Sequence, residues 1–173
     1  MRISEHISRS PAETLALGKR LAGGFKGDEV VFLVGELGAG KTVFAKGIAA
    51  GLGLKNVHQV CSPTFTLMNV YDARFPIFHF DLYRLAGAPE IAELGFEDYI
   101  GEGVVVVEWA EKITFSIPAI YVTITVADDE RRRIEIRSPL PLFYKGERGG
   151  DHSNFQKARG GRHEDRTTEK PDR

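Results

Sequence analysis

The stretch Gly35-Glu36-Leu37-Gly38-Ala39-Gly40-Lys41-Thr42 decides the fold of this 173-residue chain. It fits the pattern G-x-x-x-x-G-K-[ST], in which glycines let backbone N–H groups curl around phosphate oxygens. The apolar run 30–34 before it predicts a buried strand, and residues 41–52 after it predict a helix whose N-terminus adds partial positive charge. A strand, a glycine-rich loop and a helix in this order predict a phosphate-binding site. The pattern assigns Lys41 to the β- and γ-phosphates and the Thr42 hydroxyl to Mg²⁺.

Composition and charge narrow the class of protein. The chain is 42% hydrophobic and 27% charged, as is usual for a soluble globular domain, and its net charge of −1 makes no case for a nucleic-acid binder. The single cysteine, Cys61, excludes an internal disulfide and fits a reducing compartment. No stretch approaches the ~20 apolar residues that span a bilayer, and the N-terminus lacks the apolar core of a signal peptide. We therefore expect a cytoplasmic protein without membrane contact.

Other segments carry the patterns of helices and strands. The sequence Ser10-Pro11-Ala12-Glu13 combines a capping serine, a proline at the first helical position and the glutamate of a capping box, which predicts the start of a helix. The β-branched run 104–107 is typical of a central strand in a parallel sheet. Residues 121–126 and 133–137 alternate in hydropathy around a turn, as in a hairpin. Two short strands at 66–71 and 76–80 and a short helix at 89–94 complete the expected elements.

These elements predict an α/β fold of the P-loop NTPase type, with three layers and a mostly parallel central sheet to which antiparallel hairpins are added. We expect residues 1–144 to form this domain. Residues 145–173 carry mixed charge and almost no apolar side chains, so they cannot bury enough surface to offset their ordering entropy. This segment is predicted to be a disordered tail, or alternatively a basic tether for RNA or a partner.

Two acidic residues follow predicted strands and complete the requirements of a nucleotide site. Glu108 ends the run 104–107, where P-loop proteins carry an acidic residue that acts on Mg²⁺ directly or through water. Asp81 ends the run 77–80 and is expected to hold a metal-bound water or to orient the attacking water. The competing interpretations are a charge that merely ends a strand for Glu108, and a cap or an ion pair with Arg84 for Asp81.

Further residues have both a functional and a structural interpretation. The loop 62–65 lies where P-loop hydrolases place a hydroxyl near the γ-phosphate, but Ser-Pro-Thr also makes an ordinary turn. Trp109 either packs in the core or stacks on a base or a partner. Arg132 shares a strand face with Ile134, so it needs an anionic partner such as a nucleotide, unless it lies on a solvated hairpin edge. His79 fits a packing or hydrogen-bonding role, with too few neighbouring ligands for a zinc site.

From about Ser10 to Ile136 the chain resembles the TsaE (YjeE) family of bacterial P-loop ATPases. The P-loop alone would be unspecific, but several motifs occur in the family's order. The chain departs from the family where many members have proline after Glu-Trp, since it has Ala110 there. The matching motifs are Thr14 with Gly18, Gly35–Thr42, Ser62-Pro63-Thr64-Phe65, His79-Phe80-Asp81-Leu82-Tyr83-Arg84, Glu108-Trp109 and Arg132.

The resemblance implies an ATPase that needs ATP and Mg²⁺ and is weak on its own. Such proteins act in forming N6-threonylcarbamoyladenosine at position 37 of tRNAs that read codons beginning with A. They work with TsaD-like and TsaB-like partners, which stimulate their ATPase activity. They act on tRNA only indirectly.

The resemblance also assigns roles to individual residues. Catalysis is expected to depend on Lys41, Asp81, Thr64 and Glu108, with Thr64 sensing the γ-phosphate. The metal is expected at Thr42, Glu108 and Asp81. The expected nucleotide-binding residues are Thr14, Glu36, Leu37, Gly38, Ala39, Gly40, Lys41, Thr42, Trp109 and Arg132.

Two other classes of P-loop protein compete with this interpretation. A small-molecule kinase is also short and carries late arginines, but residues 131–133 lie in an alternating strand pattern, which argues against a mobile arginine lid. A GTPase-like switch would need the guanine-reading motif Asn-Lys-x-Asp, which the sequence lacks, so ATP is favoured over GTP.

Overall fold

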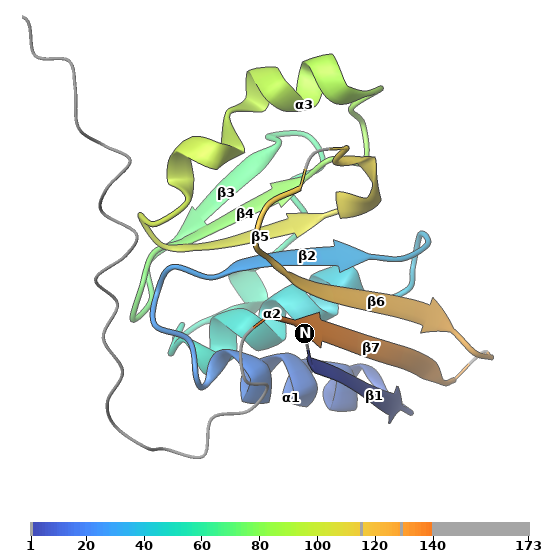
Figure 1. The fold of residues 1–173 in the computed structure, drawn as a ribbon. Coiled ribbons are helices and arrows are strands. Elements are labelled where there is room, and N and C mark those ends of the chain that lie inside the picture. The colour runs from blue at the N-terminus through green and yellow to red at the C-terminus, as the bar shows by residue number, and fades with distance from the viewer. Residues whose placement is uncertain (1, 115, 129, 140–173) are drawn as a thin grey trace, which may run out of the picture.

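A single seven-stranded sheet organises the protein (Figure 1). The computed structural model describes residues 2–114, 116–128 and 130–139. The strand order is β1-β7-β6-β2-β5-β4-β3. The strands are β1 (Arg2–Ser8), β2 (Val30–Val34), β3 (Met68–Tyr71), β4 (Ile77–Asp81), β5 (Val104–Glu108), β6 (Ile120–Val126) and β7 (Arg132–Ser138). The helices are α1 (Pro11–Ala22), α2 (Lys41–Gly51) and α3 (Ala88–Leu94), with short 3₁₀ turns η1 (Val57–Gln59), η2 (Phe96–Tyr99) and η3 (Ala110–Lys112).

The centre of the sheet is parallel and its two sides are antiparallel. Strands β6, β2, β5 and β4 run in the same direction, whereas β1 and β7 on one side and β3 on the other run against their neighbours. This arrangement confirms the predicted α/β fold with a mostly parallel centre and hairpin additions. Because β2, β5 and β4 are parallel, their carboxyl ends meet at one edge of the sheet, which is where ligands bind in such folds.

Helices cover both faces of the sheet and bury two apolar cores (Figure 1). α1 and α2 lie on one face, and α3 and η2 lie on the other face over β3, β4 and β5. The run 104–107 is buried on both sides, as expected for a central parallel strand. The first core includes Leu17, Leu21, Phe44, Ile48, Val31, Val106 and Ile134, and the second includes Phe32, Phe80, Ile91, Phe96 and Val107.

Most predicted elements are confirmed, with small differences at their ends. The Ser10 side chain accepts a hydrogen bond from the Glu13 N–H and thereby caps α1. The helix expected over 41–52 ends at Gly51. Strand β1 was not predicted, because its hydropathy is weak. It forms through long-range pairing with β7, in a register that joins Arg2 to Ser138 and Ser8 to Arg132.

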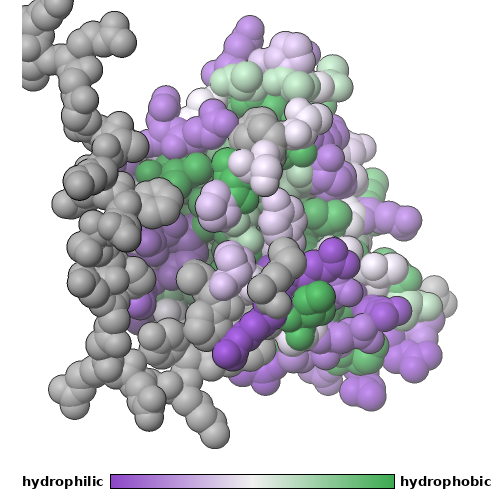
Figure 2. Space-filling view, viewed as in Figure 1, coloured by the Kyte–Doolittle hydropathy of each residue, from purple (hydrophilic) through white to green (hydrophobic). Residues whose placement is uncertain are grey.

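The outer face of β1 and β7 is mixed in character. Figure 2 shows hydrophilic residues with a few hydrophobic ones among them on this part of the surface. Ile3 and Ile7 are exposed, and Arg133 pairs with Glu5 across the two strands at 2.6 Å.

No helix in the described parts of the chain is long and apolar enough to cross a membrane, and the cytoplasmic location stays a prediction. The predicted tail 145–173, and with it the domain boundary at 144, lies outside the described residues.

Candidate functional site

The glycine-rich loop joins β2 to α2 at the carboxyl edge of the parallel strands. Gly35 has φ +151° and Gly40 has φ +113°, conformations that residues with a Cβ atom rarely adopt. A Cβ atom on Gly35 would lie 2.4 Å from the Ile124 carbonyl oxygen, so the loop can pass β6 only with glycine at this position. Around Gly38, which has φ +77°, a Cβ atom would meet nothing within 4 Å. The loop is therefore closely packed at its start and open at its tip.

Lys41 lies across the inside of this loop. Its ammonium group donates hydrogen bonds to the carbonyl oxygens of Gly35 at 2.6 Å and of Glu36 at 2.9 Å. The same group lies 3.6 Å from the centre of the Trp109 ring, a cation–π distance. Burial lowers the pKa of the Lys41 ammonium, and the carboxylates of Glu108 and others nearby act in the opposite direction. A cation is thus held at the loop where phosphate would bind.

Thr42 and Glu108 form the second part of the site. Glu108 ends β5 beside Leu33 of β2, and its buried carboxylate accepts the Thr42 hydroxyl at 2.9 and 3.1 Å. Both groups offer the hard oxygen ligands that Mg²⁺ prefers, and Mg²⁺ commonly uses few protein ligands because water and phosphate oxygens complete its shell. Residues 2–114, 116–128 and 130–139 contain no cluster of three or more His, Cys, Asp or Glu that could hold a metal by itself. The pair fits Mg²⁺ that arrives with a nucleotide.

Asp81 lies next to Glu108, on the neighbouring strand β4, and holds the loop 62–65. Its Oδ2 accepts the hydroxyls of Ser62 and Thr64, the latter at 2.9 Å, and these two hydroxyls lie 2.7 Å apart. Its Oδ1 accepts the Tyr83 N–H at 2.7 Å. No ion pair joins Asp81 to Arg84 in the part of the chain that the structure describes. Two hydroxyls and a carboxylate therefore converge beside the Thr42–Glu108 pair.

Trp109 adopts a backbone conformation that is unusual for a residue with a side chain. Its φ is +61°, in the left-handed region, which costs of order 1–3 kcal/mol in a non-glycine residue and is commonest at functional sites. The turn directs the half-buried indole between Lys41 and the Tyr83 ring, whose centre lies 4.9 Å away. Trp109 packs against the second core and also contacts Lys41 and Tyr83 at the site, and its stacking on a base or a partner stays a prediction.

Thr14 and Arg132 lie on the flank of the loop. Thr14 is buried in α1, and its hydroxyl lies 2.7 Å from that of Ser8. Its methyl carbon lies 3.9 Å from where a Cβ atom of Gly40 would be. Arg132 pairs with Ser8 in the sheet and shares a face with the buried Ile134, as its position in the alternating pattern predicts. The remaining loop residues differ in exposure: Leu37 and Glu36 are exposed and Ala39 is buried.

All the predicted site residues thus lie at or beside one edge of the sheet, and their individual roles stay predictions. Sequence reasoning missed other residues that support the site. The Lys112 ammonium donates to three carbonyl oxygens, those of Leu82, Tyr83 and Leu85, at 2.6–2.9 Å, and so ties the turn after Trp109 to the segment after Asp81. No local pattern signals such a contact, because the partners are about thirty residues apart in sequence.

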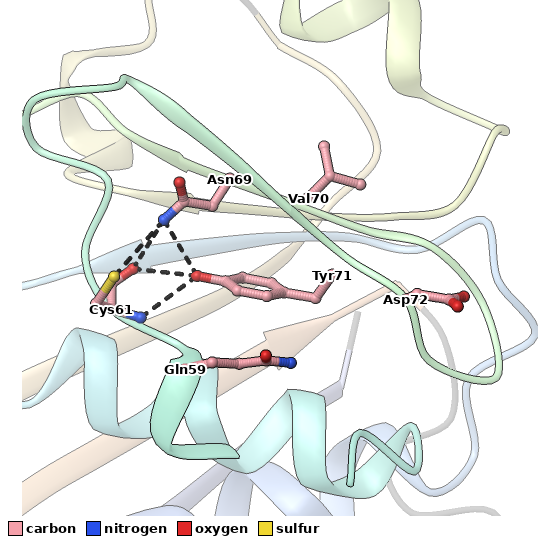
Figure 3. Close-up of a pocket in the computed structure, with 6 residues that line it drawn as sticks. All are labelled: Gln59, Cys61, Asn69, Val70, Tyr71 and Asp72. Atoms are coloured by element: carbon pink, nitrogen blue, oxygen red, sulfur yellow. Dashed lines mark hydrogen bonds between the residues drawn. The ribbon is translucent and has the colours of Figure 1, made fainter. Parts of the chain in front are cut away.

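A pocket borders the start of the loop 62–65 (Figure 3). In it the Tyr71 hydroxyl accepts the Cys61 N–H and donates to the Cys61 carbonyl, both at 3.3 Å, and the Asn69 amide donates to the same hydroxyl at 3.2 Å. These contacts fix Cys61, the residue just before the loop, to β3. The pocket is lined by Gln59, Cys61, Asn69, Val70, Tyr71 and Asp72.

Known proteins are similar to this chain over most of its length. Residues 8–135 match the family model described as "Threonylcarbamoyl adenosine biosynthesis protein TsaE". Proteins named "tRNA threonylcarbamoyladenosine biosynthesis protein TsaE" are similar. The one from Bacillus subtilis is 42% identical over 72% of this chain and 79% of its own length, and the one from Treponema pallidum is 39% identical over 75% and 97%.

A solved structure has the same fold. The crystal structure of YdiB from Bacillus subtilis superposes with a TM-score of 0.66 and 35% identity, covering 78% of this chain and 84% of that one. The two chains therefore share sequence as well as the architecture of the sheet. The chain therefore belongs to the TsaE family of threonylcarbamoyl adenosine biosynthesis proteins.

Proposed function

We propose that this chain binds Mg²⁺-ATP at the loop Gly35–Thr42 and hydrolyses it. The observation that carries the proposal is the contact of the Thr42 hydroxyl with the Glu108 carboxylate, 2.9 Å away and beside the Lys41 ammonium. A hydroxyl, a buried carboxylate and a lysine at the carboxyl edge of parallel strands are the groups that P-loop enzymes use for phosphate and metal.

Each part of the site has a distinct task in this proposal. Lys41 exchanges its carbonyl contacts for phosphate oxygens, and Thr42 and Glu108 hold the metal. Bound Mg²⁺ supplies charge neutralisation for the β- and γ-phosphates. Asp81 orients the attacking water. Thr64, whose hydroxyl donates to the Asp81 carboxylate together with that of Ser62, responds to the γ-phosphate. Thr14, Trp109 and Arg132 support the nucleotide from the flanks.

The family supports a proposal for what hydrolysis serves. We infer that ATP hydrolysis serves the formation of N6-threonylcarbamoyladenosine at position 37 of tRNAs that read codons beginning with A. The relatives named for tRNA threonylcarbamoyladenosine biosynthesis support a role in this biosynthesis. TsaD-like and TsaB-like proteins are the proposed partners, which raise the ATPase rate and contact the tRNA. This chain would then act on tRNA only through these partners.

The arginines support an ATPase better than a small-molecule kinase. Arg131 pairs with Asp128 at 2.5 Å and Arg133 pairs with Glu5 at 2.6 Å, and Arg132 begins strand β7. Because Arg132 and Arg133 lie in a strand that pairs with β6, their backbone belongs to the sheet and not to a mobile lid.

Reconstitution tests the proposal. Phosphate release is measured with the full chain alone and with the TsaD–TsaB pair, and tRNA modification is followed over repeated turnovers with and without the chain. We expect slow release alone, faster release with the pair, and sustained modification only when the chain is present. The Glu108→Gln variant should neither release phosphate nor sustain tRNA modification. Stoichiometric phosphorylation of a small acceptor, or no ATP turnover in either condition, would contradict the proposal.

A further inference from the structure

His79 is the polar residue of the motif His79-Phe80-Asp81 to which the proposed function assigns no task. Its side chain lies on the same face of β4 as Asp81 and is 1% exposed. Its Nε2 lies 2.9 Å from Oε1 of the buried Glu108 carboxylate. A polar ring this deeply buried needs a reason beyond filling space, because an apolar side chain would fill the same volume without a polar group.

The Glu108 carboxylate is held from two sides. Its Oε1 accepts both the Thr42 hydroxyl at 2.9 Å and the His79 ring nitrogen at 2.9 Å, and its Oε2 accepts the Thr42 hydroxyl at 3.1 Å. In the described part of the chain these two side chains are its hydrogen-bonding side-chain partners. An ionised carboxylate only accepts, so the Nε2 atom of His79 must carry the proton.

The other ring nitrogen fits the same tautomer. His79 Nδ1 is buried and has no hydrogen-bond partner among the described residues. The Tyr71 ring packs beside the imidazole, with ring centres 6.2 Å apart and planes inclined by 40°. A proton on Nδ1 would have no acceptor there, whereas a proton on Nε2 meets Glu108.

We propose that His79 is a positioning residue for the metal site. It donates its Nε2–H to Glu108 and holds that carboxylate against Thr42, in the orientation that the metal of a bound nucleotide needs. A second hydrogen bond of this kind fixes the direction of a ligand's lone pairs and prevents the carboxylate from rotating away. This inference rests on the proposed function, because it assigns His79 to the Mg²⁺ site of that function.

The test compares two substitutions in the full chain. His79→Gln can place an amide N–H near the position of Nε2, whereas His79→Phe keeps the ring and removes the donor. The affinity for a fluorescent ATP analogue is measured across a Mg²⁺ titration and again in EDTA. We expect His79→Phe to raise the Mg²⁺ concentration for half-maximal binding by about 10- to 100-fold, the range seen when outer-shell partners are removed. His79→Gln should raise it by much less, and affinity in EDTA should not change for either variant.

Phe80→Leu serves as the matched control. Phe80 is fully buried on the same strand but faces the other core, so its truncation destabilises the domain without touching Glu108. An equal rise in the Mg²⁺ requirement for Phe80→Leu, or an unchanged requirement for His79→Phe, would overturn the inference while leaving the proposed function intact. A wild-type chain that does not bind the analogue would instead contradict the proposed function.

A measurement without nucleotide keeps the inference testable even if His79→Phe does not fold. Long-range ¹H–¹⁵N spectra of the wild-type chain report which imidazole nitrogen is protonated. We expect His79 to show a protonated Nε2 that is protected from exchange. A bare Nε2 would overturn the inference, because Glu108 would then have no donor on that side.

Discussion

The contact between α1 and α2 gives a stability prediction whose sign is opposite to the usual one. Replacing a glycine by alanine inside a helix normally stabilises it by about 1 kcal/mol. At Gly47 of α2, however, the new Cβ atom would lie 2.3 Å from the Leu15 carbonyl oxygen and 3.0 Å from the Gly18 Cα and the Lys19 nitrogen of α1. All three are main-chain atoms, so no change of rotamer can relieve the clash.

The magnitude follows from this distance. An ordinary contact begins near 3.4 Å, so α1 would have to move away from α2 by about 1 Å. Overpacking of a core costs about 1–3 kcal/mol, and a clash between two backbones belongs at the upper end. After the gain in helix propensity, we expect Gly47→Ala to lower the free energy of unfolding by about 2 kcal/mol. For a domain of this size that corresponds to a decrease in Tm of about 4–8 °C.

Thermal and urea unfolding of the full chain measure the effect. Gly23→Ala is the matched control, because Gly23 has an ordinary φ of −59° and a Cβ atom there would have its nearest contact at 3.4 Å. It should change stability by less than about 0.5 kcal/mol. Gly18→Ala, which brings a Cβ atom to 2.5 Å from the Phe44 carbonyl oxygen, should destabilise as well. The double variant should cost less than the two single ones together, since one separation of the helices relieves both clashes. A Gly47→Ala variant as stable as the wild type would refute this reasoning.

Other residues give further predictions. Lys41→Ala should weaken ATP binding by about 10- to 100-fold, the loss of a charged hydrogen bond to phosphate, as measured by titration calorimetry. Asp81→Ala should keep ATP affinity but lower hydrolysis by about 10²- to 10⁴-fold, and normal turnover would leave this residue a structural role only. Burial raises the pKa of the Tyr71 hydroxyl above its usual 10.0, so its contribution to the free energy of unfolding should be fully present below pH 10 and be lost as the pH rises further. Urea unfolding at pH 8 and above pH 10 should show a smaller loss of stability at high pH for Tyr71→Phe than for the wild type. Deletion of residues 150–173 should leave Tm unchanged, and a large decrease would argue against the predicted tail.

The sequence predicted the centre of the fold and the composition of the site because both have local signals. The loop Gly35–Thr42 has a fixed spacing, the run 104–107 has the composition of a central strand, and Asp81 and Glu108 each end a predicted strand. Since the carboxyl ends of parallel strands meet, these signals were enough to bring the acidic residues to the loop.

What the sequence did not predict depends on contacts between distant segments. Strand β1 exists because it pairs with β7, about 130 residues later. The Glu108 contact with His79 needs the register of β4 against β5, and the three carbonyl contacts of Lys112 need the turn after Trp109. The positive φ of Trp109 has no sequence signal, because tertiary contacts hold an indole in a conformation that its own backbone disfavours.

The most direct test of a Mg²⁺-ATP site at Thr42 and Glu108 is a calorimetric titration of ATP into the full chain, in Mg²⁺ and in EDTA, for the wild type and for Thr42→Val. The substitution keeps the shape of the side chain and removes the hydroxyl that lies 2.9 Å from Glu108. We predict that Mg²⁺ tightens ATP binding to the wild type and that Thr42→Val loses this gain while its affinity in EDTA is unchanged. Equal tightening by Mg²⁺ in both proteins would contradict the site.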